Sequence, residues 1–406
     1  MNIYTQKKTN TRFIFVLVCL LMPGFACHAL AVDEPNQSIR IVSKEEMPVI
    51  LNLISTYIRE NYENIKTWSG EIEKNITWVH SGSSAENVYK KAAHAIGEAP
   101  QTLVQKAEDK IKFAVDKKKN FVFVNTLREK PSKFLDYKSG NEVGDSGPRP
   151  ISSSIIAKPD FLLKAEDYIF AKKTGHLLHN KVEKKSSDLD QRSGLYKGTY
   201  DPRKVFFPSG GFTWNIIDSL IQRIDKYGQI EFDGYRFKIE EYKEANDIEY
   251  KIIEPSIVNM ERRKPEDYAI LTKIFSRRCG FNITYWEAAT GDGKPIQIFK
   301  YEYEYIDGIY LPKKVLEQIY KNETVIAEYE SIYNNNKVNQ ELSPGTFELT
   351  NLKLIDGDVL ADKISNKEYE YKDSNLIFVK GLPIQSNGKQ ETAPPKKIDV
   401  NEPNKP

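Results

Sequence analysis

Two glutamates at alternate positions of a predicted strand are the residues that could perform hydrolytic chemistry. Glu302 and Glu304 lie on one face of the segment 299–305, with tyrosines between them. Side chains two apart on one face are separated by roughly 6.5–7 Å, twice the rise per residue, which fits the carboxylate pair of a glycoside hydrolase. The same alternation is typical of a half-exposed strand whose outer face is solvated. We prefer the second interpretation, so a glycan-active hydrolase is the least favoured function.

No other group of residues predicts catalysis or metal binding. His176 and His179 are three apart, but no HExxH pattern or suitably spaced carboxylate accompanies them, so we interpret them as surface histidines. The acidic segments 188–190 and 356–358 lack the calcium-loop pattern and are interpreted as turns. The sequence contains neither a G-x-S-x-G nucleophile elbow nor a glycine-rich phosphate loop. We therefore expect no enzyme activity, no metal and no cofactor.

Aromatic residues on the predicted strands are the better candidates for a binding site. The chain contains 23 Tyr, 19 Phe and 4 Trp. Core packing explains any one of them, but rings on a broad curved sheet with helices on one side can line an apolar cavity. Such a cavity suits an acyl chain, because each buried methylene contributes about 0.8 kcal/mol. The candidate ligand-binding residues on the sheet faces are Trp68, Ile72, Trp78, Trp286, Tyr301 and Tyr303.

The first 31 residues have the pattern of a cleavable signal peptide. A basic region ends at Arg12, the run 13–22 is apolar and uncharged, and Ala29-Leu30-Ala31 provides the small residues of a cleavage site. The apolar run is shorter than the roughly 20 residues that span a bilayer, so a retained membrane anchor is the weaker alternative. Attachment as a lipoprotein through Cys27 is weaker too, because the aliphatic residue usual three positions upstream is missing. We predict an exported protein of the periplasm or the extracellular space.

Charge and cysteine content exclude two further classes. The formal net charge is +2, and removal of the three basic signal residues brings it close to zero, which predicts no nucleic-acid partner. Cys19 and Cys27 lie in the signal segment and leave Cys279 alone, so disulfides cannot stabilise the fold. We expect Cys279 to be a buried small apolar residue.

Periodicity predicts an α+β fold in which helices precede an antiparallel sheet. A capping box at Ser43 and Glu46 starts a helix with an apolar stripe through residue 65, and the period then changes to two. A second helix starts at about residue 212, has an apolar stripe from Trp214 to Ile224 and has Gly228 as its C-cap. Strand after strand follows to residue 333, joined by tight turns such as Asp233-Gly234. Phe161–Phe170 is expected to form a short helix.

The domain organisation follows these changes of pattern. We expect a signal peptide at 1–31, a helix with the first strands at 32–137, an insertion or inter-lobe segment at 138–211, a helix with a meander completing the sheet at 212–380, and a disordered tail at 381–406.

Short motifs resemble the LolA/RseB-like periplasmic lipoprotein-carrier superfamily, whose members sort or sense outer-membrane lipoproteins. The matches are the helix that runs into Trp68-Ser69-Gly70-Glu71-Ile72-Glu73, the stretch 303–315 around Asp307-Gly308, Gly280-Phe281-Asn282, and Phe347-Glu348-Leu349 with the following Asp356-Gly357. The resemblance covers mainly 43–126 and 230–360. It implies an antiparallel sheet curved into an incomplete barrel, with helices packed on one face over an apolar cavity. It transfers no binding residue to this chain.

These observations favour a cell-envelope protein that encloses a lipid, an acyl chain or a lipoprotein without catalysis. A sensor or adaptor that binds an envelope membrane protein, through a sheet edge or the segment 138–193, is the alternative. Sheet faces completely filled by side chains would contradict the first hypothesis.

Overall fold

The computed structural model describes most of the chain downstream of the predicted signal peptide. The described residues are 38–92, 95–146, 151–159, 162–168, 171–178, 203, 213–227, 231–232, 235–244, 247–257, 268–352, 354, 356–362, 365, 367–373 and 375–381. The predicted signal peptide, Cys27, His179, the acidic segment 188–190 and the predicted tail beyond its first residue, Gly381, lie outside them.

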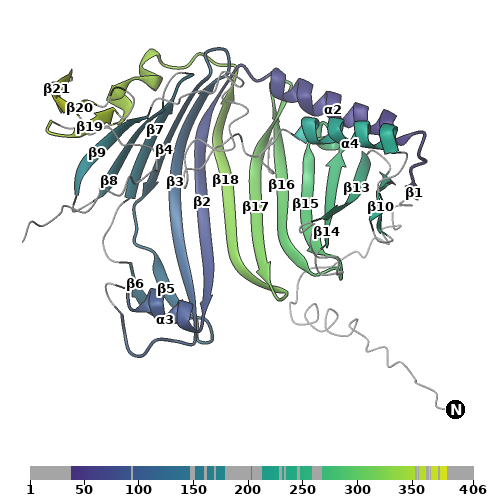
Figure 1. Cartoon of the computed structure of the whole chain (residues 1–406), viewed down its shortest axis with the longest axis horizontal. Helices are drawn as coiled ribbons and strands as arrows, with labels where there is room; N and C mark the ends of the chain where they lie inside the picture. Colours follow the sequence, from purple (N-terminus) through teal and green to yellow (C-terminus); the bar gives the residue numbers. More distant parts are fainter. Residues whose placement is uncertain are drawn as a thin grey trace, which may run out of the picture.

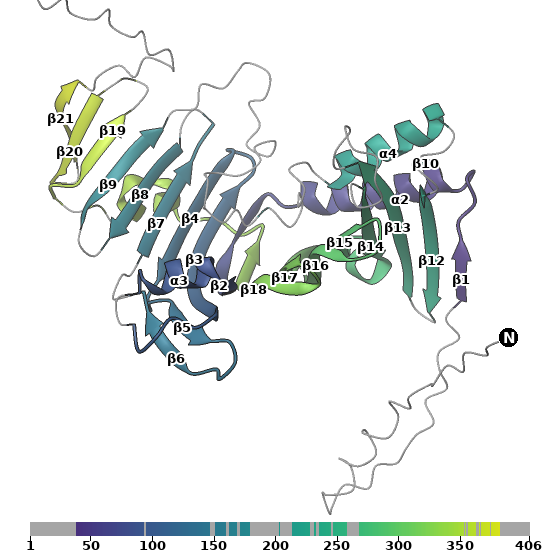
Figure 2. The same ribbon diagram turned by 60° about the horizontal axis from the view of Figure 1, so that its bottom comes forward.

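One large sheet, with nineteen strands among the described residues, dominates this part of the molecule, and the two halves of the chain meet in its middle (Figures 1 and 2). The C-terminal meander consists of β12 (Lys238–Glu244), β13 (Asp247–Ile257), β14 (Tyr268–Ser276), β15 (Ile283–Thr290), β16 (Pro295–Ile306), β17 (Ile309–Lys321) and β18 (Thr324–Val338). The N-terminal half contributes β2 (Thr67–Ser81), β3 (Thr102–Asp116), β4 (Phe121–Arg128), β7 (Ile151–Ala157), β8 (Leu162–Tyr168) and β9 (Ala171–Leu178). Antiparallel pairing of β18 with β2 joins the halves.

The two ends of this sheet are built by segments distant in sequence. β1 (Ser38–Ile41) pairs with β12, and β9 pairs in parallel with β19 (Val359–Asp362), which is followed by β20 (Lys367–Lys372) and β21 (Asn375–Gly381). β5 (Lys133–Asp136) and β6 (Glu142–Asp145) branch from β3, and β10 (Glu231–Phe232) with β11 (Tyr235–Arg236) forms a small hairpin. Because β1 and β21 do not pair in the described part, the sheet is open, which confirms the predicted α+β fold with an incomplete antiparallel barrel.

Two helices, α2 (Met47–Glu63) and α4 (Thr213–Tyr227), lie side by side over one face of the C-terminal meander (Figures 1 and 2). The predicted capping box is present, because Glu46 N–H donates to Ser43 Oγ at 3.4 Å and Ser43 N–H donates to Glu46 Oε2 at 3.1 Å. Asp218 joins the helices by accepting hydrogen bonds of 2.6 Å from Ser55 Oγ and from Arg59. Among the described residues no helix is both long and apolar enough to cross a membrane.

Shorter helical elements close the turns. They are α3 (Ser83–Tyr89) after β2, and the 3-10 turns η5 (Arg277–Cys279), η6 (Pro344–Phe347) and η7 (Leu349–Leu352).

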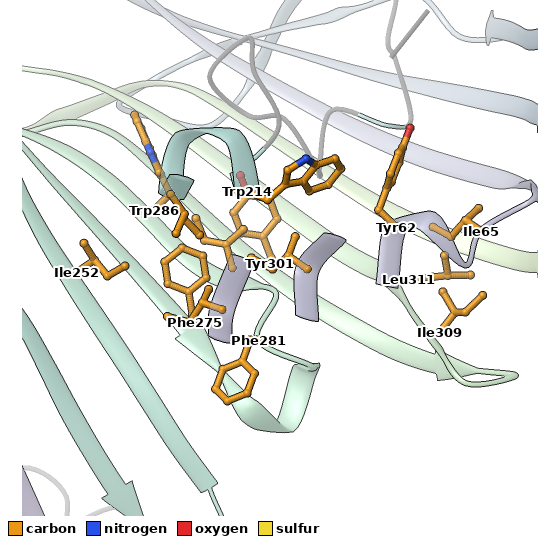
Figure 3. Close-up of a cluster of buried hydrophobic side chains, with 14 of the residues drawn as sticks. Tyr62, Ile65, Trp214, Ile252, Phe275, Phe281, Trp286, Tyr301, Ile309 and Leu311 are labelled. Carbon is orange, nitrogen blue, oxygen red and sulfur yellow. The ribbon is translucent and has the colours of Figure 1, made fainter. Parts of the chain in front are cut away.

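Side chains from both helices and from the sheet face beneath them form the main core (Figure 3). The helices contribute Leu51, Ile54, Ile58, Trp214, Ile217 and Leu220, all buried. A second core lies on the opposite face of the sheet. Val115 and Ile155 point into the main core, whereas their neighbours Ala114 and Ile156 belong to the second cluster. The C-terminal residues Phe347, Leu352, Leu360 and Tyr371 cover this second face.

The prediction of a short helix over residues 161–170 is wrong, because Leu162–Tyr168 is strand β8. It pairs with β7 on one side and β9 on the other. Leu163 and Ala165 alternate into the second core, so packing against the distant C-terminal segment determines the conformation.

An ion-pair cluster fixes the edge strand β1. Arg40 donates to Glu241 on β12 and to Glu46 at the start of α2, with shortest distances of 2.8 Å to each carboxylate. The hydrogen bond from Arg40, with further contributions from Lys243, lowers the pKa of Glu241 from 4.5 to about 2. The cluster therefore connects β1 both to the sheet, through β12, and to the start of helix α2.

Candidate ligand-binding face of the sheet

Two of the predicted binding residues, Trp68 and Ile72 on β2, lie in the closed part of the main core. Each is 1% exposed. The Trp68 ring packs edge-on against Phe113, with centroids 4.8 Å apart, and stacks on Tyr333 at 6.1 Å. Its Nε1–H donates to Asn336 Oδ1 at 2.9 Å. Neighbouring side chains fill this end of the face.

Three further candidates lie on β15 and β16, in a stack of rings. Trp286 packs edge-on against Phe299 with centroids 5.5 Å apart, and Phe299 stacks on Tyr301 at 6.0 Å. Tyr303 donates its hydroxyl to the Ile283 carbonyl at 2.8 Å, and burial raises the pKa of Tyr303. Figure 3 shows Trp286 and Tyr301 beneath the helices together with Trp214.

The last candidate, Trp78, lies further along β2 and is only half-buried. Its Nε1–H donates to Tyr329 Oη on β18 at 2.9 Å, and the two rings are edge-to-face. Trp78 is not part of the main core, so the structure separates it from Trp68 and Ile72.

Strand register nevertheless places these residues on one continuous face. Trp286 is opposite Phe299, Phe299 opposite Glu317, and Glu317 opposite Tyr329. Cross-strand partners share a face, so the row runs from β15 to β18. Several apolar side chains on this face are only half-buried. We call them the open face: Leu271, Phe299, Val315, Ile319, Tyr329 and Trp78. They adjoin the core that the helices cover.

Polar groups interrupt this apolar surface. Gln297 donates to Glu317 at 2.7 Å, and Lys273 forms a 2.7 Å ion pair with Glu254. Both members of the Lys273–Glu254 pair are buried, with side chains 5% and 8% exposed. Burying a charge pair costs desolvation energy that only good geometry offsets. The Lys273–Glu254 pair therefore gives this otherwise apolar face a polar position.

Trp286 carries a buried hydrogen-bond donor that is not satisfied. Its side chain is 9% exposed, and Nε1 has no hydrogen-bond partner. Lys273 is its cross-strand partner on the face. Leaving such a donor unpaired costs about 1–3 kcal/mol, so an acceptor brought by a ligand would recover that energy. Trp286 was predicted as a binding residue because of its aromatic ring, and no sequence pattern indicates its unsatisfied N–H.

The carboxylates that could have performed hydrolysis do not form an open catalytic pair. Glu302 is exposed and lies opposite Lys314 on β17. Glu304 is half-buried and accepts a 2.7 Å hydrogen bond from Asn336 Nδ2. Asn336 is held in turn by the Pro312 carbonyl and by Trp68, so Glu304 belongs to a structural network.

The candidate metal ligands, the acidic segment 356–358 and Cys279 do not form a reactive site in the described residues either. In the described ranges no three His, Cys, Asp or Glu side chains are arranged to hold a metal ion. Asp356 accepts a hydrogen bond from the Asp373 backbone beside Gly357, whose φ of +88° marks the predicted turn. Cys279 is half-buried, and burial raises the pKa of its thiol, which disfavours the reactive thiolate.

A wide groove of about 750 Å³ lies on the opposite side of the sheet. It separates β2 and β3 from the segment 340–351, and its walls carry amides and charged groups beside the Phe113 and Phe123 rings. Glu71 and Lys112 form a 2.9 Å ion pair there. No local sequence pattern indicates this groove, because residues more than 200 positions apart form it.

No protein-family model matches the sequence, and no curated protein matches it. Solved structures do show similarity. A domain from Vibrio parahaemolyticus, described as an outer membrane lipoprotein-sorting protein domain, is 9% identical with a TM-score of 0.32, over 74% of this chain and 98% of that one. A LolA superfamily protein from Nitrosomonas europaea is 12% identical with a TM-score of 0.25, and the match covers 73% of this chain and 98% of that one. A DUF1329 family protein from Desulfovibrio piger is 8% identical with a TM-score of 0.25, and the match covers 74% of this chain and 98% of that one.

Two of these structures have printed descriptions that refer to the superfamily which the short sequence motifs resemble. Similarity of this extent identifies no family, no ligand and no binding residue in this chain.

Proposed function

We propose that the chain is an exported cell-envelope protein that binds an apolar ligand with a carbonyl group on the open face of the sheet, without catalysis. Acylated lipids and lipoproteins have this chemistry. The unsatisfied Nε1–H of Trp286 is the observation that carries the proposal, because it is a buried donor beside half-buried apolar side chains. The signal-peptide pattern of residues 1–31 supports the export.

In this arrangement the acyl chain lies along the half-buried residues Phe299, Val315 and Tyr329. Each methylene removed from water contributes about 0.8 kcal/mol. The ester or amide carbonyl accepts the hydrogen bond from Trp286 and fixes the position of the chain. Trp78 is part of the open face, and Tyr301 and Tyr303 border it. Trp68 and Ile72 support the closed end beneath it.

Native mass spectrometry of the mature protein, purified from the envelope without detergent, tests this proposal. We expect an added mass that fragments as a lipid or an acylated peptide. Trp286→Phe keeps an aromatic ring but removes the N–H, and should reduce the ligand-bound fraction about tenfold, the factor of a buried hydrogen bond. Trp68→Phe is the matched control, because its N–H is already bonded to Asn336. An unliganded mass that stays unchanged after incubation with lipids refutes ligand enclosure.

A partner-binding adaptor is the second candidate, favoured by the outer edge of the sheet. Strand β21 pairs only with β20 in the described part, and it exposes Ile377, Phe378 and Val379 at 49%, 56% and 46%. An exposed apolar edge strand is a template for strand addition by another protein. Recovery of a membrane protein, without lipid, in a pull-down that Phe378→Lys abolishes would favour this function.

A further inference from the structure

A second pocket lies at the C-terminal end of α2, separate from the open face. Its volume is about 300 Å³. The walls come from α2, from the turn that contains η5, and from the hairpin between β16 and β17. The motifs Gly280-Phe281 and Asp307-Gly308, noted in the sequence, both belong to these turns.

Aromatic rings make up much of the wall. Tyr57 on α2 packs against Phe281 with centroids 5.3 Å apart, and Tyr305 packs against Tyr310 at 4.7 Å. Tyr57 and Tyr305 are 47% and 63% exposed, so their faces are available to a ligand. Both pairs are tilted, with interplanar angles of 55° and 46°. The exposed face of an aromatic ring carries negative potential, which attracts cations.

The pocket is held rigidly. Asn61 is buried, and its side-chain amide clamps the Tyr310 backbone: Nδ2 donates to the carbonyl at 2.9 Å and Oδ1 accepts from N–H at 2.8 Å. On the opposite wall Gly280 and Phe281 both have positive φ, of +61° and +56°. Left-handed backbone at a non-glycine residue costs roughly 1–2 kcal/mol and persists only where the surroundings enforce it.

Two opposite charges line this pocket without neutralising each other. Glu60 and Arg277 are both exposed, and within the part of the chain described neither forms an ion pair or a side-chain hydrogen bond. The neighbouring Arg278, by contrast, pairs with Asp247 at 3.6 Å. A ligand that carries both an anion and a cation would complement Arg277 and Glu60 together.

An exposed apolar stripe leads along α2 to the pocket. Val49, Leu53 and Tyr57 follow at intervals of four residues and are 69%, 39% and 47% exposed. Residues four apart lie on one side of a helix, so the stripe and the Tyr57 wall of the pocket share that side. Exposed apolar side chains next to tyrosines suit a membrane interface, where a tyrosine keeps its ring in apolar surroundings and its hydroxyl in water. Arg277 on η5 lies in the same pocket as Tyr57.

We propose that this pocket binds the headgroup of a zwitterionic phospholipid at a membrane surface, with Val49 and Leu53 contacting the acyl region. Arg277 donates to the phosphate, and the ammonium group lies among the tyrosine rings next to Glu60. This docking surface is independent of the open face, since it lies outside the core that α2 covers.

Vesicle co-sedimentation of the purified mature protein, without residues 1–31, tests the proposal. We expect binding to phosphatidylcholine vesicles at least about tenfold tighter than to phosphatidylglycerol vesicles, which lack the ammonium group. Arg277→Gln, Glu60→Gln and Leu53→Ser should each weaken the binding to phosphatidylcholine by about tenfold, as expected for loss of a charge-assisted contact or of buried apolar area. The matched controls Arg278→Gln and Glu63→Gln change neighbouring charges outside the pocket and should have no effect.

Two results overturn the proposal. One is equal binding to both vesicle types, and the other is binding that Arg277→Gln and Glu60→Gln leave unchanged while the urea midpoints show folded protein. Competition by millimolar soluble phosphocholine that depends on Arg277 supports headgroup recognition. Trp286→Phe should not alter vesicle binding, so failure of this proposal is distinguishable from failure of the proposed function.

Discussion

The Gly280→Ala substitution tests how tightly the turn before β15 is packed. The backbone φ at Gly280 is +61°, and a Cβ atom placed there would lie 2.7 Å from both Cδ2 and Cε2 of Tyr310. Tyr310 cannot easily move away, because Asn61 clamps its backbone N–H and carbonyl. Gly293 provides a matched control: its φ is +83°, but nothing lies within 4 Å of an added Cβ.

The two substitutions share a backbone penalty and differ in the steric one. Placing alanine in the left-handed region costs about 1–2 kcal/mol at either position. At Gly280 the methyl group must also displace the Tyr310 ring, and overpacking of this kind costs about 1–3 kcal/mol more. We therefore expect Gly280→Ala to lower the free energy of unfolding by about 2–5 kcal/mol, against about 1–2 kcal/mol for Gly293→Ala.

Urea denaturation with linear extrapolation measures both free energies. A double-mutant cycle with Tyr310→Ala isolates the steric part, because in that background the added methyl group meets no ring. Equal destabilisation by Gly280→Ala and Gly293→Ala would refute the reasoning. So would a cycle with no coupling between positions 280 and 310.

Three further substitutions have effects that follow from single contacts. Asn336→Ala leaves the buried Trp68 Nε1–H without its acceptor and should lower the free energy of unfolding by about 1–3 kcal/mol in urea titrations; an unchanged midpoint would contradict the network. Lys273→Met removes the ammonium bound to buried Glu254 and should cost about 3 kcal/mol, most of which the double variant with Glu254→Gln recovers. Glu241 has a pKa lowered from 4.5 to about 2, so its stabilising effect is complete above pH 4.5 and is lost as the pH falls towards 2. The difference in unfolding free energy between wild type and Glu241→Gln should shrink over that interval, and a constant difference would exclude the assignment.

Local periodicity was enough to predict both long helices and most strands of the C-terminal meander. The apolar stripe through Ile54 and Ile58 predicts the helix α2 without knowledge of the surface against which it packs. The alternation from Phe281 to Trp286 likewise predicts a strand. The antiparallel meander also follows from consecutive hairpins, whereas the incomplete barrel was implied only by the resemblance of the short motifs. These features depend on residues close in sequence.

The remaining features depend on contacts between distant segments. β7 begins Ile-Ser-Ser-Ser and carries little apolar signal. It nevertheless becomes a strand, because it pairs with β4 and β8 along its two edges and the C-terminal residues pack on one of its faces. The candidate site was predictable only as a set of aromatic residues. A register shift between Asn334 and Lys337 brings Asn336 to Trp68 and closes that end of the face, and no spacing near Trp68 indicates it.

The pairing of β18 with β2 has a consequence for how the chain reaches this structure. Trp78 and its hydrogen-bonded partner Tyr329 are 251 positions apart, and Arg40 and Glu241 are 201 apart. Contacts of such separation carry a large loop-closure entropy and slow the folding of a domain. Until β18 has been synthesised, β2 keeps an unpaired edge that presents Ile72 and Ile76 to any other extended chain. Assembly of the nascent protein is therefore a late, whole-chain event, and fragments ending before residue 324 should aggregate rather than fold.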